Sequence, residues 1–268
     1  ICGPLPGCSA PALPEVGQDV GRAAFVDQAH RPAIIQVSAH LVQRHGPQNV
    51  KRWFDTARSI TSGNVFLHLD HCQDESLIRK CISAGWDMVM FDGSQFSIDE
   101  NCERTAKVVR QAHAFGVAVE GEVGQVGGEE DGLLAEANTA KLDDIVQLST
   151  QTNIDCIAVG FGNLHGDYRG KDHLRWDVYE KAHELSGLPL VLHGGSGLSV
   201  AEFRRAIHAG TAKINISTAL KKGYANVVAE AELAPRLVNT PALLHDFLQE
   251  SVKQSTYDFI TLFSEGKR

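Results

Sequence analysis

Residues 188–217 read LPLVLHGGSGLSVAEFRRAIHAGTAKINIS and contain one complete strand–helix–strand unit. The apolar runs 188–193 and 212–217 have the Val, Ile and Leu content of parallel strands buried on both faces. Between them, Ser199-Val-Ala-Glu202 matches a capping box that begins a helix, and Gly210 is a typical residue just after a helix. The stretch therefore predicts two parallel strands joined by a helix.

The same alternation of apolar runs and helical patterns continues through most of the chain. Strand-like runs occupy residues 33–38, 64–70, 87–92, 117–122, 155–160, 188–193 and 212–217. Helical patterns lie at about residues 47–61, 74–84, 98–115, 139–152, 176–186, 199–209 and 218–230. Asp74 is a further candidate N-cap, and Gly85 and Gly116 are further terminators. Such a series predicts a parallel sheet, open or closed, and the number of units favours an α/β fold of the (β/α)8 TIM-barrel type.

We expect a single domain over residues 1–268, with the barrel motifs in residues 33–228 and a C-terminal helical segment in residues 229–268. Residues 1–32 are atypical, because they are rich in Pro, Gly and Ala where an eighth strand should lie. Val20–Val26 is the only candidate strand there, and its pattern is more helical than extended. Residues 123–138 form the longest irregular stretch, which predicts a functional loop.

Composition excludes several classes of protein. Hydrophobic residues make up 43% of the 268 residues, which is too many for a disordered chain. The net charge of −8 and the lack of a basic stripe argue against nucleic acid as a partner. No apolar run reaches the roughly 18 residues of a membrane helix. The six scattered cysteines are typical of buried thiols in a reducing compartment, so we expect a cytoplasmic protein without a membrane partner.

Polar side chains stand where the predicted strands end. His71, His165 and His193 follow three different strands, and the carboxyl ends of parallel barrel strands meet at one face. Three histidines without cysteine are the ligand set of a catalytic Zn²⁺ that keeps one position open for substrate, and cobalt or iron(II) would accept the same nitrogens. The alternative for each histidine alone is a structural role in the core.

Two carboxylate groups are candidate general acid/base catalysts. Asp70 directly precedes His71 and can reach the same pocket; its alternative role is to cap the following helix, for which Asp74 competes. Gly124–Gly132 contains three consecutive acids, Glu129 to Asp131, between glycine hinges. This segment is either a solvated loop tip or a closing lid that carries an acid/base, and its position after a strand that ends in carboxylates favours the lid.

Two segments are candidates for binding a phosphate group. Gly194–Gly197 follows one predicted strand, and Asn215–Thr218 follows the next at the start of a helix. Loops after the last two strands of a barrel are the usual place for phosphate, where backbone N–H groups and a helix N-terminus supply positive ends. A single Gly-Gly-Ser-Gly segment would ordinarily be a turn, and two adjacent segments favour phosphate.

Five motifs resemble the class II, metal-dependent fructose-bisphosphate and tagatose-bisphosphate aldolases, in the family's order. They are Leu67–His71, Gly121–Gly132, Gly160–Gly166, Leu192–Gly197 and Lys213–Thr218. The resemblance implies an aldehyde-lyase that makes or cleaves a ketose phosphate, with dihydroxyacetone phosphate as donor or product, through a metal-stabilised enediolate. It also implies a sugar-phosphate substrate and a homodimer or homotetramer.

The resemblance also implies a role for individual residues. His71, His165 and His193 would bind one catalytic Zn²⁺, Asp70 would handle the aldehyde oxygen, and Glu130 would remove the proton next to the ketone. Asp92 and Glu122 match positions that hold a second metal in some members. The donor phosphate and substrate would be held, beside a monovalent cation (Na⁺ or K⁺), by Gly166, Gly194, Gly195, Ser196, Asn215, Ile216, Ser217, Thr218 and, near the aldehyde, Ser38.

The sequence departs from the family's pattern in the half of the site that would hold the acceptor. The family's opening strand is not recognisable, Ala39 to Val42 replaces an expected turn after Ser38, and Ser217 stands where one subgroup has Asp. Pro235–Pro241 is only weakly similar to the C-terminal stretch of the family, in which an arginine holds a second phosphate. Charge for that phosphate would have to come from a neighbouring subunit or from Arg22, Arg31, Arg44 or Arg236. A metal-dependent hydrolase barrel and a non-catalytic binding descendant are the alternatives.

Overall fold

The computed structural model describes residues 8–11, 32–60, 64–130, 133–166, 173–232 and 240–265. Its main sheet has the order β1-β11-β10-β8-β5-β4-β3-β2, with every neighbouring pair parallel. β1 also lies beside β2, so the strands curl into a barrel of the TIM type. The strands are β1 (Cys8–Pro11), β2 (Ala33–Ser38), β3 (Val65–Cys72), β4 (Met88–Phe91), β5 (Ala118–Val123), β8 (Cys156–Val159), β10 (Leu190–Leu192) and β11 (Thr211–Ile216).

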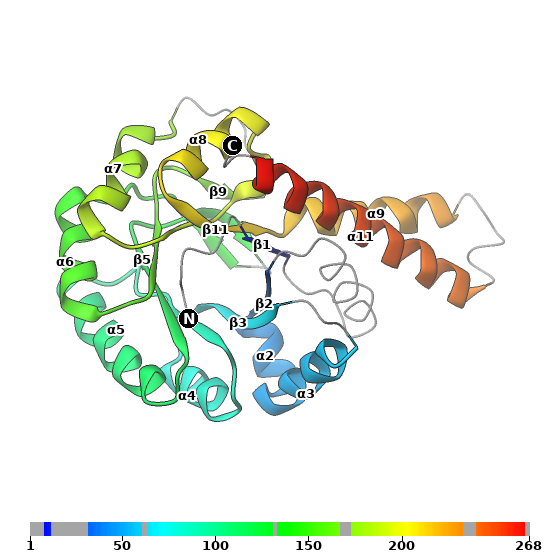
Figure 1. Ribbon diagram of the computed structural model, residues 1–268, viewed down its shortest axis with the longest axis horizontal. Helices are drawn as coiled ribbons and strands as arrows, with labels where there is room; N and C mark the ends of the chain where they lie inside the picture. Colours follow the sequence, from blue (N-terminus) through cyan, green and yellow to red (C-terminus); the bar gives the residue numbers. More distant parts are fainter. Residues whose placement is uncertain are drawn as a thin grey trace.

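The helices expected from the sequence surround the strands (Figure 1). They are α3 (Pro47–Arg58), α4 (Glu75–Ser83), α5 (Ile98–His113), α6 (Leu142–Thr152), α7 (Trp176–Ser186), α8 (Val200–His208) and α9 (Thr218–Glu232). Their predicted ends are confirmed: Asp74 accepts a hydrogen bond from the Ser76 N–H, and Ser199 and Glu202 form the capping box. Gly85, Gly116 and Gly210 have positive φ, as residues just after a helix often do.

Two helices extend or modify the expected pattern. α2 (Ala39–His45) begins directly after Ser38, at the residues that depart from the turn of the resembled family. α11 (Pro241–Glu265) lies beside α9, and the pair extends away from the barrel (Figure 1), which agrees with a helical C-terminal segment. None of the described helices is long and apolar enough to cross a membrane.

The first barrel strand is β1, and the sequence interpretation of residues 1–32 was wrong to find no strand outside Val20–Val26. Cys8–Pro11 pairs in parallel with β11, from Cys8 opposite Lys213 to Pro11 opposite Ile216. Four residues that include Ser, Ala and Pro carry no apolar strand pattern, so only pairing with β11 identifies them as a strand. Val20–Val26 lies outside the described residues.

Residues 123–138 contain a hairpin and are not the irregular loop expected from their glycine content. β6 (Gly127–Glu130) pairs antiparallel with β7 (Leu133–Ala135) and parallel with β9 (Leu164–His165) in a separate small sheet. Gly128 has φ +94°, and a Cβ atom there would lie 2.3 Å from the His165 carbonyl oxygen. Glycine therefore permits the close approach of the hairpin to β9.

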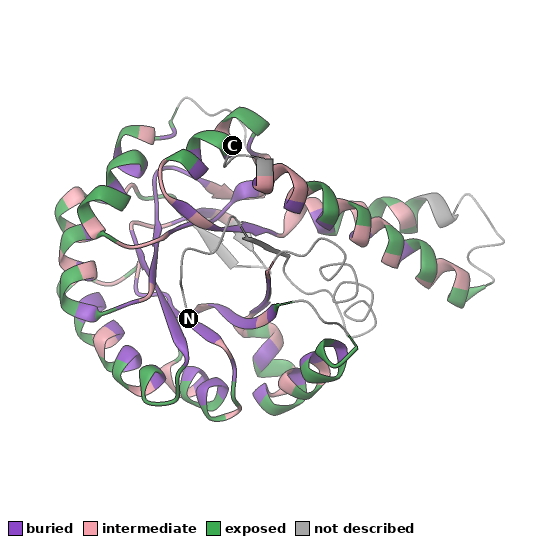
Figure 2. Cartoon of the chain, viewed as in Figure 1, coloured by how far each residue is buried: buried purple, intermediate pink, exposed green. Residues whose placement is uncertain are grey.

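Apolar contacts hold the strands against the helices, as the buried strands and exposed outer helix faces in Figure 2 show. Inside the barrel, a small apolar cluster contains Met88, Ala118, Cys156, Ala158 and Val191. Nearer the carboxyl ends of the strands the buried side chains are polar: Gln36, His68, Asp70, Glu120, Glu122, His193, Lys213 and Asn215. Barrel interiors are ordinarily filled by branched apolar residues, so this polar layer indicates a functional site.

Candidate active site

Three histidines meet at the carboxyl ends of the strands, as the sequence predicted. Nitrogens of His71, His165 and His193 all lie within 4.8 Å of one another. His71 Nε2 is 2.8 Å from His193 Nδ1, and the His71 ring centroid is 5.1 Å from that of His165. His71 is the penultimate residue of β3, His165 belongs to β9, and His193 follows β10. Separate elements therefore bring three imidazoles to one point.

An irregularity in β3 places Asp70 and His71 in the same site. Leu69 pairs with Val89 but Cys72 pairs with Phe91, so β3 has one extra residue between these pairs. His71 has φ +43°, an uncommon value for a residue with a side chain. A regular strand would send neighbouring side chains to opposite faces, and a bulge of this kind redirects one of them.

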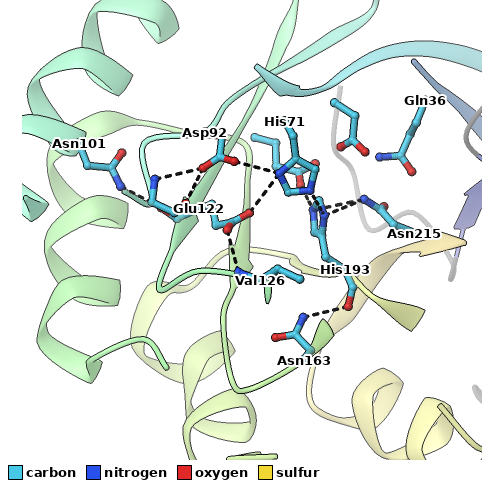
Figure 3. Close-up of polar contacts among 12 residues, drawn as sticks. Gln36, His71, Asp92, Asn101, Glu122, Val126, Asn163, His193 and Asn215 are labelled. Carbon is cyan, nitrogen blue, oxygen red and sulfur yellow. Dashed lines mark hydrogen bonds and ion pairs between the residues drawn. The ribbon is translucent and has the colours of Figure 1, made fainter. Parts of the chain in front are cut away.

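His71 also belongs to a second group with Asp92 and Glu122 that could hold a metal ion. Its Nδ1 is 3.0 Å from Asp92 Oδ2 and 3.7 Å from Glu122 Oε2 (Figure 3). Ser94 donates backbone and side-chain hydrogen bonds to the other Asp92 oxygen. Burial opposes ionisation of Asp92, but His71 and Ser94 lower its pKa to about 2.

The charges around the histidines favour a cation. Burial lowers the pKa of His71, but Asp70, Asp92 and Glu122 outweigh it and raise this pKa well above its ordinary value. Burial and Asp92 raise the pKa of Glu122, and its buried Oε2 has no hydrogen-bond partner among the described residues. Three imidazole nitrogens beside such carboxylates suit a divalent metal ion, so the donor set fits the metal that the sequence predicts.

Asp70 lies at the edge of this site. It is 7% exposed, it pairs in register with Ser38 on β2, and its Oδ1 has no hydrogen-bond partner within the described ranges. Asp74 caps α4, so Asp70 is not needed for that role. A buried carboxylate oxygen left for another partner is consistent with an acid/base group.

The two predicted phosphate segments are adjacent. The turn Gly195–Gly197 follows Gly194, and the Ser196 hydroxyl accepts a hydrogen bond from the Ala219 N–H at the start of α9. The Ser217 hydroxyl is buried and has no hydrogen-bond partner in the described structure. Asn215 and Ile216 are buried at the end of β11, and Thr218 begins α9. Gly166 has φ +92° directly after His165.

The structure describes several other predicted site residues only in part or not at all. Glu130 is the last residue of β6, and its side chain lies outside the described part of the structure. Arg44 is exposed at the end of α2, whereas Arg22, Arg31 and Arg236 lie outside the described residues. Cys72, Cys81, Cys102 and Cys156 are buried thiols, which agrees with the expectation from the sequence.

Sequence reasoning gave no role to a buried charged pair beneath the histidines. Glu120 Oε1 is 2.7 Å from His193 Nε2, and Glu120 Oε2 is 2.9 Å from Lys213 Nζ. Burial opposes ionisation of Glu120, yet Lys213 and His193 lower its pKa. Burial likewise lowers the pKa of Lys213, but Glu120 reverses the effect and raises it. Two features of the sequence could have indicated this pair: Lys213 lies inside an apolar strand, and Glu120 lies two residues before Glu122 on another strand.

Comparison with known proteins identifies the family. The model of the class II fructose-bisphosphate aldolase family matches residues 18–268. This chain belongs to that family. A 6-phospho-5-dehydro-2-deoxy-D-gluconate aldolase from Shouchella clausii is 40% identical over 198 residues, covering 71% of this chain and 68% of that protein. A fructose-bisphosphate aldolase from Streptococcus pneumoniae serotype 4 is 36% identical, covering 93% and 89%.

A solved structure agrees with this membership. The crystal structure of the YdjI aldolase from Escherichia coli K12 aligns with a TM-score of 0.79 and 27% identity, covering 97% of this chain and 92% of that one. The chain is therefore an enzyme, a carbon–carbon lyase of the class II aldolase family. The family membership does not support the two alternatives, a metal-dependent hydrolase and a non-catalytic descendant. The family is metal dependent, and the histidine cluster is a possible site for that metal.

Proposed function

We propose that this class II aldolase is a zinc enzyme that makes or cleaves a ketose phosphate, with dihydroxyacetone phosphate as donor or product. The observation that carries the proposal is the convergence of His71, His165 and His193 beside the buried Asp70 carboxylate. His71, His165 and His193 would hold the ion. Zinc bound there would supply a Lewis acid that favours negative charge on the ketone oxygen of the substrate.

Two carboxylates of the chain would move the protons. Glu130, on the hairpin next to β9, would take the proton from the carbon beside the ketone. Asp70 would give a proton to the aldehyde oxygen during condensation and take it back during cleavage. The close pairing of β6 with the β9 strand that carries His165 supports this division, because it brings the hairpin near the histidines.

The phosphate of the donor would lie between the loop Gly194–Ser196 and the start of α9 at Asn215–Thr218, with Gly166 nearby. Backbone N–H groups and the helix N-terminus give fixed positive ends there, and the Ser217 hydroxyl, which has no partner among the described residues, can donate a further hydrogen bond. This remote contact would hold the deprotonated donor in place for the aldehyde. Ser38, in register with Asp70, would lie on the aldehyde side.

Further expectations accompany this function. Asp92 and Glu122 would hold a second metal ion, and Na⁺ or K⁺ would accompany the phosphate. We expect a homodimer or homotetramer in the cytoplasm that acts on small sugar phosphates, without a nucleic-acid or membrane partner.

Two measurements test the proposal. Metal analysis of the purified protein should find about one tightly bound zinc per chain, and chelator should remove it together with all cleavage activity. Full cleavage of ketose phosphates in excess chelator would contradict the proposal. Incubation with dihydroxyacetone phosphate in D₂O should give deuterium exchange without any aldehyde, which identifies the donor.

A further inference from the structure

Glu120 is a buried charge that the proposed reaction does not use. It lies on β5 with 0% exposure, two residues before Glu122, so both side chains leave the same, inner face of the strand. A carboxylate in the middle of a barrel is costly unless both oxygens are engaged. Here each oxygen has a different partner, His193 at 2.7 Å and Lys213 at 2.9 Å. The Lys213 charge compensates that of Glu120, which leaves the contact with His193 to be explained.

The two nitrogens of His193 face different surroundings. Nε2 faces Glu120 Oε1, whereas Nδ1 faces His71 Nε2 at 2.8 Å, in the direction of the three-histidine cluster. An ionised carboxylate only accepts hydrogen bonds, so the proton of a neutral His193 ring lies on Nε2. The unprotonated Nδ1 then carries the lone pair that a metal requires.

Lys213 orients Asn215 so that, of these two neighbours of His193, only Glu120 can accept the Nε2 proton. Its ammonium group donates to Asn215 Oδ1 at 2.9 Å as well as to Glu120. Because the Asn215 oxygen is turned to Lys213, its NH₂ group faces His193, at 3.1 Å from Nδ1 and 3.2 Å from Nε2 (Figure 3). Asn215 therefore offers donors to His193 and cannot accept the Nε2 proton. The Asn163 NH₂ group fixes the other side of the residue by donating to the His193 carbonyl oxygen at 2.9 Å.

We propose that Glu120 is a positioning residue of the metal site: it holds His193 in the Nε2–H tautomer, so that the unprotonated Nδ1 faces the three-histidine cluster, while Lys213 compensates its charge. This inference rests on the proposed metal role of His193. Carboxylates that accept the distal N–H of a metal-bound histidine fix the tautomer and ring orientation, and their loss typically weakens metal affinity about 10–100-fold.

Zn²⁺ affinity measured by chelator competition on metal-free protein tests this role without reference to activity. In Glu120→Gln, Lys213 retains the amide oxygen, so the amide N–H faces Nε2 and favours the wrong tautomer of His193. We expect the Zn²⁺ Kd to rise about 10–100-fold. The matched control is Glu180→Gln, which makes the same change at an exposed carboxylate of α7 that pairs with Arg205 of α8 at 2.6 Å; its Zn²⁺ Kd should stay at the wild-type value.

A second variant separates positioning from charge balance. Glu120→Leu combined with Lys213→Met removes both buried charges together, so the melting temperature should stay near that of the wild type. Under our proposal this pair still binds Zn²⁺ at least tenfold more weakly. Wild-type Zn²⁺ affinity in the folded double variant, or in Glu120→Gln, would overturn the role of Glu120. Failure of the wild-type protein itself to bind Zn²⁺ would instead overturn the proposed function.

Discussion

Asp70 and His71 are neighbours in the chain, yet they face one site because β3 bulges between Leu69 and Cys72. Their assigned chemistry is different: an imidazole suits a metal ion, and a buried carboxylate suits proton transfer. At the scale of single residues the proposed mechanism therefore predicts separable effects on metal binding and on rate.

Loss of one histidine should remove the metal. In His193→Ala, two of three imidazoles remain, and we expect the Zn²⁺ content to fall to a small fraction of one per chain with cleavage lost. Circular dichroism should still report the helices, because the barrel core is built from other side chains. Wild-type zinc content in this variant would contradict the ligand assignment.

The two proposed acid/base residues should differ in one partial reaction. Asp70→Asn and Glu130→Gln should each retain zinc but lose about 10²–10⁴-fold in cleavage rate. Only Glu130→Gln should also suppress deuterium exchange into dihydroxyacetone phosphate, because that exchange needs no aldehyde. Exchange that survives in Glu130→Gln and disappears in Asp70→Asn would mean that the two roles are reversed.

Among the elements of the site, the loop after β10 and the strand β9 approach each other closely through their backbones. Gly194 has φ +69°, and a Cβ atom there would lie 2.3 Å from the Leu164 carbonyl oxygen, next to His165. The loop after β10 and the strand β9 are thus in direct contact, so a candidate phosphate segment and a candidate metal ligand depend on the same packing.

This contact gives a prediction with a matched control. Gly116 has φ +71°, but a Cβ atom there would meet no described atom within 4 Å, so Gly116→Ala should cost only the left-handed backbone penalty of about 1–2 kcal/mol. Gly194→Ala should lower the melting temperature further and raise KM for the donor phosphate, because Leu164 must move. Equal melting temperatures and KM values in the two variants would show that the close approach is unimportant.

Across the whole molecule, the groups that could bind phosphate are unevenly placed. The candidate donor segments Gly194–Ser196 and Asn215–Thr218 are adjacent, whereas Arg44, a candidate for a second phosphate, is exposed in the last turn of α2. One relative is named a 6-phospho-5-dehydro-2-deoxy-D-gluconate aldolase and another a fructose-bisphosphate aldolase, so the family includes aldolases for more than one substrate.

We therefore expect this enzyme to act on a singly phosphorylated ketose, whose aldehyde half is uncharged, at least as well as on fructose 1,6-bisphosphate. A second dianionic phosphate needs a fork of donors such as arginine or a nest of N–H groups. Comparison of kcat/KM for fructose 1,6-bisphosphate and fructose 1-phosphate decides the point. A hundredfold preference for the bisphosphate, about 2.7 kcal/mol, would reveal a second phosphate site.

The sequence by itself determined the parallel strands, their helices and the face on which the histidines gather, because apolar runs, caps and strand ends are local patterns. Tertiary structure alone decided β1, the hairpin of β6 and β7, and the Glu120–Lys213 pair beneath His193. Cys8–Pro11 is a strand because β11 pairs with it, and Glu120 meets Lys213 across 93 residues of chain. Such features depend on partners distant in sequence, whose positions are fixed only when the barrel closes.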